Sequence, residues 1–91
     1  MTKGKEPPKE WRLHELKTWP KYFREVLVGR KHTEHRRADR DFQVGDVLRL
    51  REWNPVKKEY TGREVFRRVR YLYEPHEAPG FVVLELEEQE P

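Results

Sequence analysis

The first feature of the chain is an alternation of apolar and polar residues with a period of two. Residues 47–53, 64–73 and 81–86 alternate in this way, which predicts strands that turn one face toward a core. Residues 11–16 alternate well enough to form a further strand, and residues 31–37, without Gly or Pro, are expected to be extended. In the longest predicted strand, one face carries Val65, Arg67, Val69, Tyr71 and Tyr73.

A helical pattern interrupts these strands once, near the N-terminus. Thr18 is a suitable N-cap, and Pro20 falls in the first turn, where a backbone N–H is not needed. Gly29 suits the left-handed position that ends a helix. We expect Trp19, Phe23 and the distant Phe66 to pack in the core. The apolar residues at three- and four-residue spacing are Trp19, Tyr22, Phe23, Val26 and Leu27.

The spacing of strands and turns predicts the fold class. Short strands separated by turns, such as Val44-Gly45-Asp46, favour a small barrel or sandwich. We therefore predict a mixed α+β domain, mainly β, with about five strands in a small barrel or sandwich and one short flanking helix. Residues 11–87 form this domain, residues 1–10 are expected to be a disordered leader, and residues 88–91 an acidic tail.

Composition narrows the class of protein further. Of the 91 residues, 34% are apolar and 41% are charged, and no run approaches the length of a membrane span. The chain has no cysteine, so disulfides and thiolate metal sites are excluded. The first ten residues lack the apolar stretch of a signal peptide, and we expect a cytoplasmic monomer. One Met and few amides beside many Arg and Glu indicate a thermophile.

The charges are clustered rather than evenly mixed. The formal net charge is +3, and the last residues of the chain are rich in glutamate. Such clustering predicts a positive face that attracts phosphate groups. One basic cluster consists of Arg30, Lys31, Arg36, Arg37 and Arg40, and the other of Arg63, Arg67, Arg68 and Arg70.

The segment after the predicted helix carries a motif. Gly29, Lys31, Glu34 and Arg36 match the pattern G-x-K-x-x-E-x-R position for position. With its flanking blocks, this segment resembles the ASCH domain family, in a branch of short bacterial and phage proteins. The flanking blocks that strengthen the resemblance are His14–Lys17, Trp19–Phe23, Asp41–Asp46, Leu50–Trp53 and Tyr60–Glu64.

The resemblance implies a PUA-like β-barrel and a role in binding or modifying RNA. Some members of the ASCH family are amidohydrolases that act on 4-acetylcytidine through a Lys, a Thr and a Glu, and ribonuclease activity is also described. The Lys matches Lys31, but the Thr position holds Glu34, and the adjacent Thr33 points to the other face of a strand. Glu74 and Glu77 are candidates for the distal Glu. The departure at Glu34 argues against carrying the deacetylase activity over.

The charged residues of the motif allow different chemistry. Glu34 and Arg36 share one face of a strand, and Lys31 reaches the same site if the chain still turns after Gly29. Glu34 would then hold Arg36 in a bidentate ion pair and leave Lys31 for a phosphate or a carbonyl. Alternatively, Glu34 accepts hydrogen bonds from a base edge while Arg36 stacks or binds phosphate. A third interpretation is a lattice of surface salt bridges without a ligand.

The leading hypothesis is a module that binds RNA, a nucleotide or a nucleoside in a basic cleft between the helix and the barrel. Trp53 is expected to share a strand face with Arg49 and Arg51, where it would stack on a base. The residues predicted to bind the nucleic acid are Lys17, Lys31, Glu34, Arg36, Arg37 and Trp53.

Two other functions remain as alternatives. A small hydrolase of a modified nucleoside or of RNA would use Lys31 as amine or general base, Glu34 as acid–base partner and His14 in support. An accessory protein would instead bind another protein through its charged faces. His32 and His35 point to opposite faces of a strand and no third ligand stands out, so we predict no metal site and no cofactor.

Overall fold

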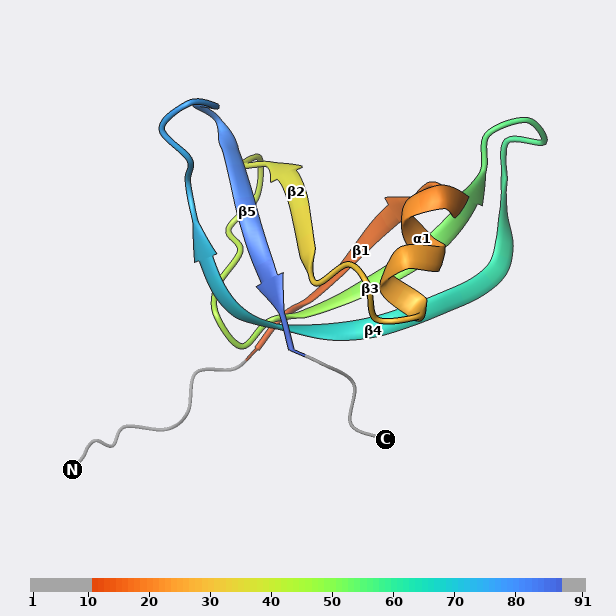
Figure 1. The fold of residues 1–91 in the computed structure, drawn as a ribbon, viewed down its shortest axis with the longest axis horizontal. Helices are drawn as coiled ribbons and strands as arrows, with labels where there is room; N and C mark the ends of the chain where they lie inside the picture. Colours follow the sequence, from red (N-terminus) through yellow and green to blue (C-terminus); the bar gives the residue numbers. More distant parts are fainter. Residues whose placement is uncertain (1–10, 88–91) are drawn as a thin grey trace.

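The computed structural model describes residues 11–87, which form a mainly β domain with one short helix (Figure 1). The predicted leader, residues 1–10, and the predicted acidic tail, residues 88–91, lie outside the described residues. No helix in the described part of the chain is long and apolar enough to cross a bilayer. In chain order the elements are β1 (Leu13–Thr18), α1 (Pro20–Leu27), β2 (Thr33–Arg37), β3 (Val47–Asn54), β4 (Glu59–Tyr73) and β5 (Phe81–Leu86).

The strands form one five-stranded sheet in the order β1-β3-β4-β5-β2. β1 and β3 are parallel, and the other neighbouring strands are antiparallel. Residues 59–68 of β4 pair with β3, and residues 69–73 pair with β5. Figure 1 shows the resulting curve of β4 beneath the other strands. One long strand therefore joins the two halves of a bent sheet.

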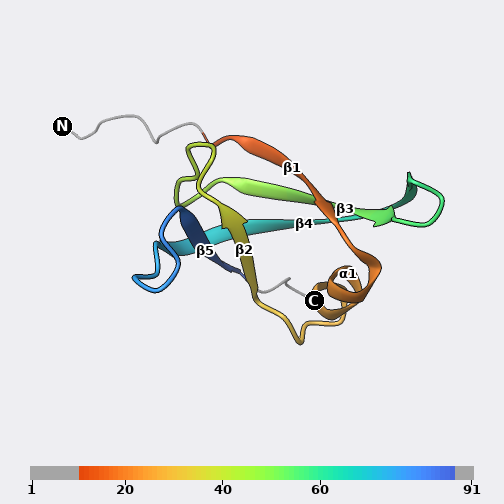
Figure 2. The same cartoon turned by 90° about the horizontal axis from the view of Figure 1, so that it is seen from above.

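The predicted mainly β fold with one early helix is confirmed, but the predicted closure into a barrel is wrong. β1 and β2 are the two edges of the sheet, and no backbone pairing joins them. In Figure 2 the edge strands lie opposite each other, with α1 beside the end of β1. The edges stay apart because α1 lies between β1 and β2 in the chain and leads it away from the edge of β1 before β2 begins. The opening between the edges is where the candidate site lies.

The helix begins and ends through its backbone. Trp19, not Thr18, is the N-cap, because Thr18 is the last residue of β1; the predicted cap is therefore wrong. Gly29 adopts a φ of 87°, as the prediction of a left-handed residue requires. The N–H of Arg30 donates to the Glu25 carbonyl at 2.9 Å, and that of Gly29 to the Val26 carbonyl at 3.1 Å. This Schellman arrangement satisfies the last carbonyls of the helix and turns the chain toward β2.

The core lies on the inner face of the bent sheet, beneath α1. Only Phe23 and Val26 of the helix are fully buried, so the helix packs through one narrow stripe. Trp19 and Phe66, both predicted to be core, are 55% and 45% exposed. Phe66 faces outward because its neighbours Val65 and Arg67 occupy the inner positions of β4. The sheet and loop residues of the core are Leu16, Phe42, Leu48, Leu50, Val65, Val69, Val82, Leu84 and Leu86.

A β-bulge changes the inward face of β4 near its end. The register shifts between Val69, which pairs with Leu86, and Tyr71, which pairs with Glu85. An extra residue on one strand moves the following side chains to the other face. Leu72 therefore packs against the core. The prediction that Tyr71 continues the face of Val69 is wrong for this reason, and Tyr71 is 54% exposed.

Candidate functional site

A cavity of about 620 Å³ occupies the opening between the edge strands, and we call it the edge groove. Residues 17–19 and Tyr22, from the end of β1 and the start of α1, form one wall. Lys31 and residues 33–36, which lead into and form β2, make the opposite wall. The structure thus brings together four of the predicted site residues: Lys17, Lys31, Glu34 and Arg36.

Arg36 bridges the two walls of the edge groove. Its Nε donates to Glu34 Oε2 at 2.7 Å, and its Nη2 lies 2.7 Å from the same oxygen. The same Nη2 donates to the carbonyl of Lys17 at 2.7 Å, so a side chain of β2 reaches the backbone of β1. The predicted Glu34–Arg36 pair is present, but through one carboxylate oxygen. Within residues 11–87, Glu34 Oε1 and Arg36 Nη1 make no hydrogen bond, so both keep hydrogen-bonding capacity that the protein does not use.

Thr18 contributes a hydroxyl that sequence reasoning missed. It is 3% exposed and lines the edge groove, and its Oγ1 has no hydrogen-bond partner in the described structure. A buried hydroxyl without a partner is costly, and native structures rarely keep one without a reason. The signal in the sequence was the period of two, because Thr18 follows the inward positions His14 and Leu16.

Cations and aromatic rings surround the opening of the edge groove. The Lys31 ammonium donates to the carbonyl of Thr33 and thereby lies along the β2 wall. Trp19 and Tyr22 are 55% and 50% exposed although both are large and apolar. Both were predicted to belong to the apolar face of the helix, but here they line the groove. An exposed ring beside a cation is the arrangement that stacks on nucleobases.

Trp53 lies beside the edge groove rather than in its lining. The ammonium of Lys17 sits 3.8 Å from the centroid of the Trp53 ring, and Tyr60 meets the same ring edge-on at 5.0 Å. The register of β3 shifts between Arg51 and Trp53. Trp53 therefore contacts the lining of the edge groove through the ammonium of Lys17, in a cation–π arrangement.

Arg37 points to a second cavity, of about 330 Å³, which we call the adjoining cavity. Its guanidinium lies 5.4 Å from the ring centroid of Phe81, on β5. His35 and Arg36 line both the edge groove and the adjoining cavity, so the two spaces share a boundary. Arg37 is thus separate from the edge groove but next to it.

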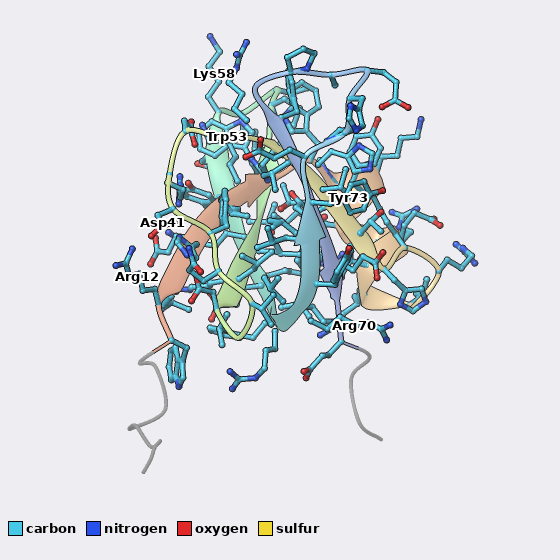
Figure 3. All side chains as sticks on the ribbon, turned by 90° about the vertical axis from the view of Figure 1, so that its left-hand side faces the viewer. Arg12, Asp41, Trp53, Lys58, Arg70 and Tyr73 are labelled. Atoms are coloured by element: carbon cyan, nitrogen blue, oxygen red, sulfur yellow. The ribbon has the colours of Figure 1, made fainter. Side chains whose placement is uncertain are left out.

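His14 lies outside the lining of the edge groove, contrary to its predicted place. The residue is buried, and its Nε2 lies 2.8 Å from Asp46 Oδ2. Asp46 also accepts the N–H of Arg12 at 3.0 Å and that of Gln43 at 2.9 Å. The Arg12 and Asp41 side chains form an exposed ion pair beside this cluster (Figure 3). His14 therefore fastens the start of β1 to the segment before β3.

The electrostatics of Asp46 support this structural role. Burial by itself raises the pKa of the Asp46 carboxyl, but the hydrogen bonds that it accepts outweigh burial and hold the pKa below its ordinary value. An ionised carboxylate only accepts hydrogen bonds, so the imidazole of His14 donates to it. The Asp46 carboxylate is satisfied by donors of the fold, and neither His14 nor Asp46 lines the edge groove.

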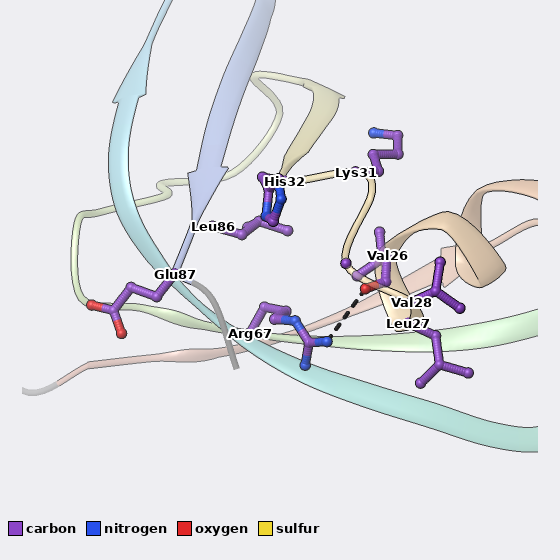
Figure 4. A pocket seen from close by; sticks show the side chains of 9 residues that line it. Val26, Leu27, Val28, Lys31, His32, Arg67, Leu86 and Glu87 are labelled. Atoms are coloured by element: carbon purple, nitrogen blue, oxygen red, sulfur yellow. Dashed lines mark hydrogen bonds between the residues drawn. The ribbon is translucent and has the colours of Figure 1, made fainter. Parts of the chain in front are cut away.

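A third cavity, of about 220 Å³, lies below the C-terminal end of α1 (Figure 4). Arg67 is nearly buried there and donates to the carbonyls of Phe66, at 2.8 Å, and Val26, at 3.4 Å. Burial lowers the pKa of the Arg67 guanidinium. Arg67 of the second basic cluster thus supports the helix end rather than a surface for phosphate. Among residues 11–87, no three His, Asp or Glu side chains gather as metal ligands.

The fold and the edge groove define a class of small β-rich domain in which one bent, open sheet and a short helix enclose a polar groove. Within that class, the chain belongs to the DUF3850 family, described as a domain of unknown function, whose model matches residues 13–86. The match includes every strand and the helix. The family description assigns no activity, so the chemistry of the groove has to suggest one.

A relative from Escherichia phage P2 is named "Uncharacterized 12.9 kDa protein in GpA 3'region". It is 45% identical to this chain over 58 residues, which is 64% of this chain and 51% of that protein. The aligned part thus spans about half the length of the relative. The similarity connects the chain to a phage protein and leaves its activity to be inferred from the site.

Proposed function

We propose that the chain binds RNA and that the edge groove receives a nucleotide. The observation that carries the proposal is that one groove is lined by two residues with unused polar atoms: the buried hydroxyl Thr18 Oγ1, which has no partner, and the carboxylate oxygen Glu34 Oε1, which accepts nothing from the protein. Both atoms belong to side chains whose positions are fixed, one by burial and one by the ion pair to Arg36. A polar ligand edge would satisfy both.

The chemistry around these two atoms matches the parts of a nucleotide. Glu34 Oε1 would accept an N–H from a base edge, as carboxylates do when they read bases. Trp19 or Tyr22 would stack on the base, since each leaves about half of its surface exposed beside the groove. Lys31 and Arg36 would meet the phosphate, with Lys17 adding to the positive field. Arg36 is already held by two acceptors, so little side-chain freedom is lost when the ligand binds.

The motif gives independent support. Lys31, Glu34 and Arg36, which match the ASCH-like pattern, all line the edge groove. ASCH and PUA-like domains are associated with RNA, and a shared motif at a groove of suitable chemistry is the link on which the proposal draws. Fold-level similarity alone would carry less weight than this coincidence of motif and groove.

The alternative of hydrolysis rests on Lys31 and Glu34 lying in the same groove. It is the weaker candidate because one carboxylate oxygen of Glu34 is already engaged by Arg36, and the Lys31 ammonium by a backbone carbonyl. An acid–base pair needs groups that exchange protons with the substrate. A carboxylate held by a guanidinium is better suited to orienting a ligand than to receiving its proton.

A binding and turnover assay on the wild type and three variants tests the proposal. A labelled, mixed-sequence single-stranded RNA is titrated with wild type, Lys31→Ala and Lys31→Arg, with Lys57→Ala as the control from the exposed β3–β4 turn. We expect Lys31→Ala to weaken binding about tenfold, Lys31→Arg to retain most of it, and affinity to fall steeply with salt because phosphate contacts release counterions.

The same proteins are also incubated with 4-acetylcytidine and other modified nucleosides, and with the RNA. Mass spectrometry then measures the products. A product that disappears in both Lys31 variants would replace the binding proposal with hydrolysis, because an arginine cannot serve as an activated amine. An RNA affinity that does not change with salt concentration would contradict phosphate recognition. Absence of both binding and turnover would leave a protein partner as the function to pursue.

A further inference from the structure

The adjoining cavity continues the edge groove along both edge strands. The edge groove uses residues 17–18 of β1, and the adjoining cavity uses Leu16 of the same strand. On the other side, both spaces are lined by His35 and Arg36, and the adjoining cavity extends to Arg37. At about 330 Å³, the adjoining cavity lies within the range of ~300–1,000 Å³ typical of ligand pockets. The adjoining cavity therefore has room for a second ligand group beside the nucleotide proposed for the edge groove.

The lining of the adjoining cavity is cationic and aromatic. Arg37 and Arg40 are exposed, and each guanidinium lies over a ring: Arg37 at 5.4 Å from the centroid of Phe81, and Arg40 at 5.7 Å from that of Phe42. Asp39 opposes only Arg40, at 3.9 Å. In the part of the chain that the structure describes, Arg37 makes no hydrogen bond. Its donors are therefore available to a phosphate or a base.

Arg36 stands where the two cavities meet. Its Nε and Nη2 are fixed by Glu34 and by the Lys17 carbonyl, while Nη1 makes no hydrogen bond within residues 11–87. With Nε and Nη2 engaged, Nη1 is the nitrogen left to meet a phosphate, so one phosphate bound there would lie beside both cavities. A single phosphate shared by two nucleosides is a phosphodiester link. The arrangement of donors therefore matches a strand better than two separate nucleotides.

We propose that the ligand is an oligonucleotide of which at least two consecutive nucleotides are bound, rather than a free nucleotide or nucleoside. One base enters the edge groove, the linking phosphate lies against Arg36, and the next nucleotide occupies the adjoining cavity between Arg37 and Arg40. The ring of Phe81, which is 38% exposed, is available to that nucleotide. This inference rests on the proposed RNA-binding function and specifies the class of ligand.

A length series tests the inference. The four nucleoside 5′-monophosphates, the four homodinucleotides and the corresponding tetranucleotides compete with a labelled RNA for the wild type and for Arg37→Ala/Arg40→Ala. Both arginines are exposed, so the variant is expected to fold. Lys57→Ala/Arg70→Ala is the control, because it removes the same charge from exposed residues that line neither cavity.

For wild type, we expect the best dinucleotide to bind at least tenfold more tightly than its mononucleotide. Arg37→Ala/Arg40→Ala should abolish this gain, measured as the ratio of dinucleotide to mononucleotide affinity in the same protein, while the control keeps the gain. Equal affinity for mononucleotide and dinucleotide in wild type would overturn the inference and leave the proposed function intact. A gain that survives in Arg37→Ala/Arg40→Ala would also overturn it. If the labelled RNA itself does not bind, the proposed function fails, and the inference fails with it.

Discussion

The buried polar groups at the two ends of β1 differ in whether they have hydrogen-bond partners. At the start of the strand, His14 is buried against Asp46, which accepts hydrogen bonds from three groups of the protein. At its end, Thr18 is equally buried, but its hydroxyl has no partner in the described structure. Across the groove from Thr18, Glu34 is satisfied at one oxygen only. The carboxylate at one end of β1 is fully partnered by the protein, whereas the hydroxyl at the other end has no partner in the described structure.

This difference is the basis for expecting residues at one end to hold the fold and residues at the other end to contact the ligand of the proposed function. Both His14 and Glu34 are buried ionisable residues in or next to a sheet edge, and sequence reasoning treated them as members of one site. Their hydrogen-bond partners distinguish them, because a functional polar group keeps capacity that the protein leaves unused. Substitutions at the two ends should therefore change different measurements.

The largest expected effect is on stability, from Asp46→Asn. The substitution removes the charge and turns one acceptor into a donor that faces groups which themselves donate. Breaking a buried, hydrogen-bonded pair of this kind costs about 3 kcal/mol of the free energy of unfolding at pH 7. Urea denaturation measures the change. RNA affinity of the folded variant should stay that of wild type, because Asp46 does not line the edge groove.

The pH dependence sharpens this prediction. The folded-state pKa of Asp46 lies below its ordinary value, so its stabilising effect is present above the unfolded pKa of ~3.9 and is lost as the pH falls through the folded pKa. The difference in stability between wild type and Asp46→Asn should therefore narrow as the pH falls below ~4. The exposed carboxyl changed in Asp39→Asn serves as the control. A difference that stays constant from pH 7 to pH 3 would contradict the structural role of Asp46.

Local pattern predicted much of the fold, and long-range pairing explains what it missed. Residues 81–86 form a strand as predicted, and Gly29 ends the helix because its conformation is set by its immediate neighbours. The open sheet was not predictable from alternation, which says that a strand has two faces but not which strand lies beside it. The bulge after Val69 was missed for the same reason, because it is a relation between β4 and β5.

The candidate site was predictable where the motif covers it. Lys31, Glu34 and Arg36 line one groove, although their charges alone were equally compatible with a surface lattice. Thr18 was missed because the same residue type that caps helices also ends strands, and only the structure shows its hydroxyl unpartnered. His14 was misplaced because the sequence gives no measure of its distance from Asp46.

An intermediate effect, on binding rather than on stability, is expected from Thr18→Val. Valine keeps the shape of threonine and removes a buried hydroxyl without a partner, so the free energy of unfolding should stay the same or rise by about 1 kcal/mol. RNA binding should weaken about fivefold, the equivalent of one lost hydrogen bond. Thermal melts and RNA titrations of the same preparations measure the two changes.

Thr18→Ser is the matched control for this prediction. Serine keeps the hydroxyl and removes a buried methyl group, so it should bind RNA like wild type and lose some stability. The opposite pattern, with Thr18→Val less stable and unchanged in binding, would show that the hydroxyl supports the fold. The end of β1 at Thr18 would then serve the fold as the end at His14 does, and the proposed difference between the two ends would be contradicted.

The smallest expected effect comes from Trp53→Leu, which tests how Trp53 serves the site. The Lys17 ammonium lies 3.8 Å from the Trp53 ring centroid, and Trp53 does not line the edge groove, so its loss should act by loosening Lys17. A cation–π contact of about 0.5–1 kcal/mol predicts a two- to fivefold loss of RNA affinity. In a double-mutant cycle with Lys17→Ala, Trp53→Leu should then add little further loss. Base stacking on Trp53, the role that the sequence suggested, would instead cost about 1–3 kcal/mol, and the loss would persist in the Lys17→Ala background.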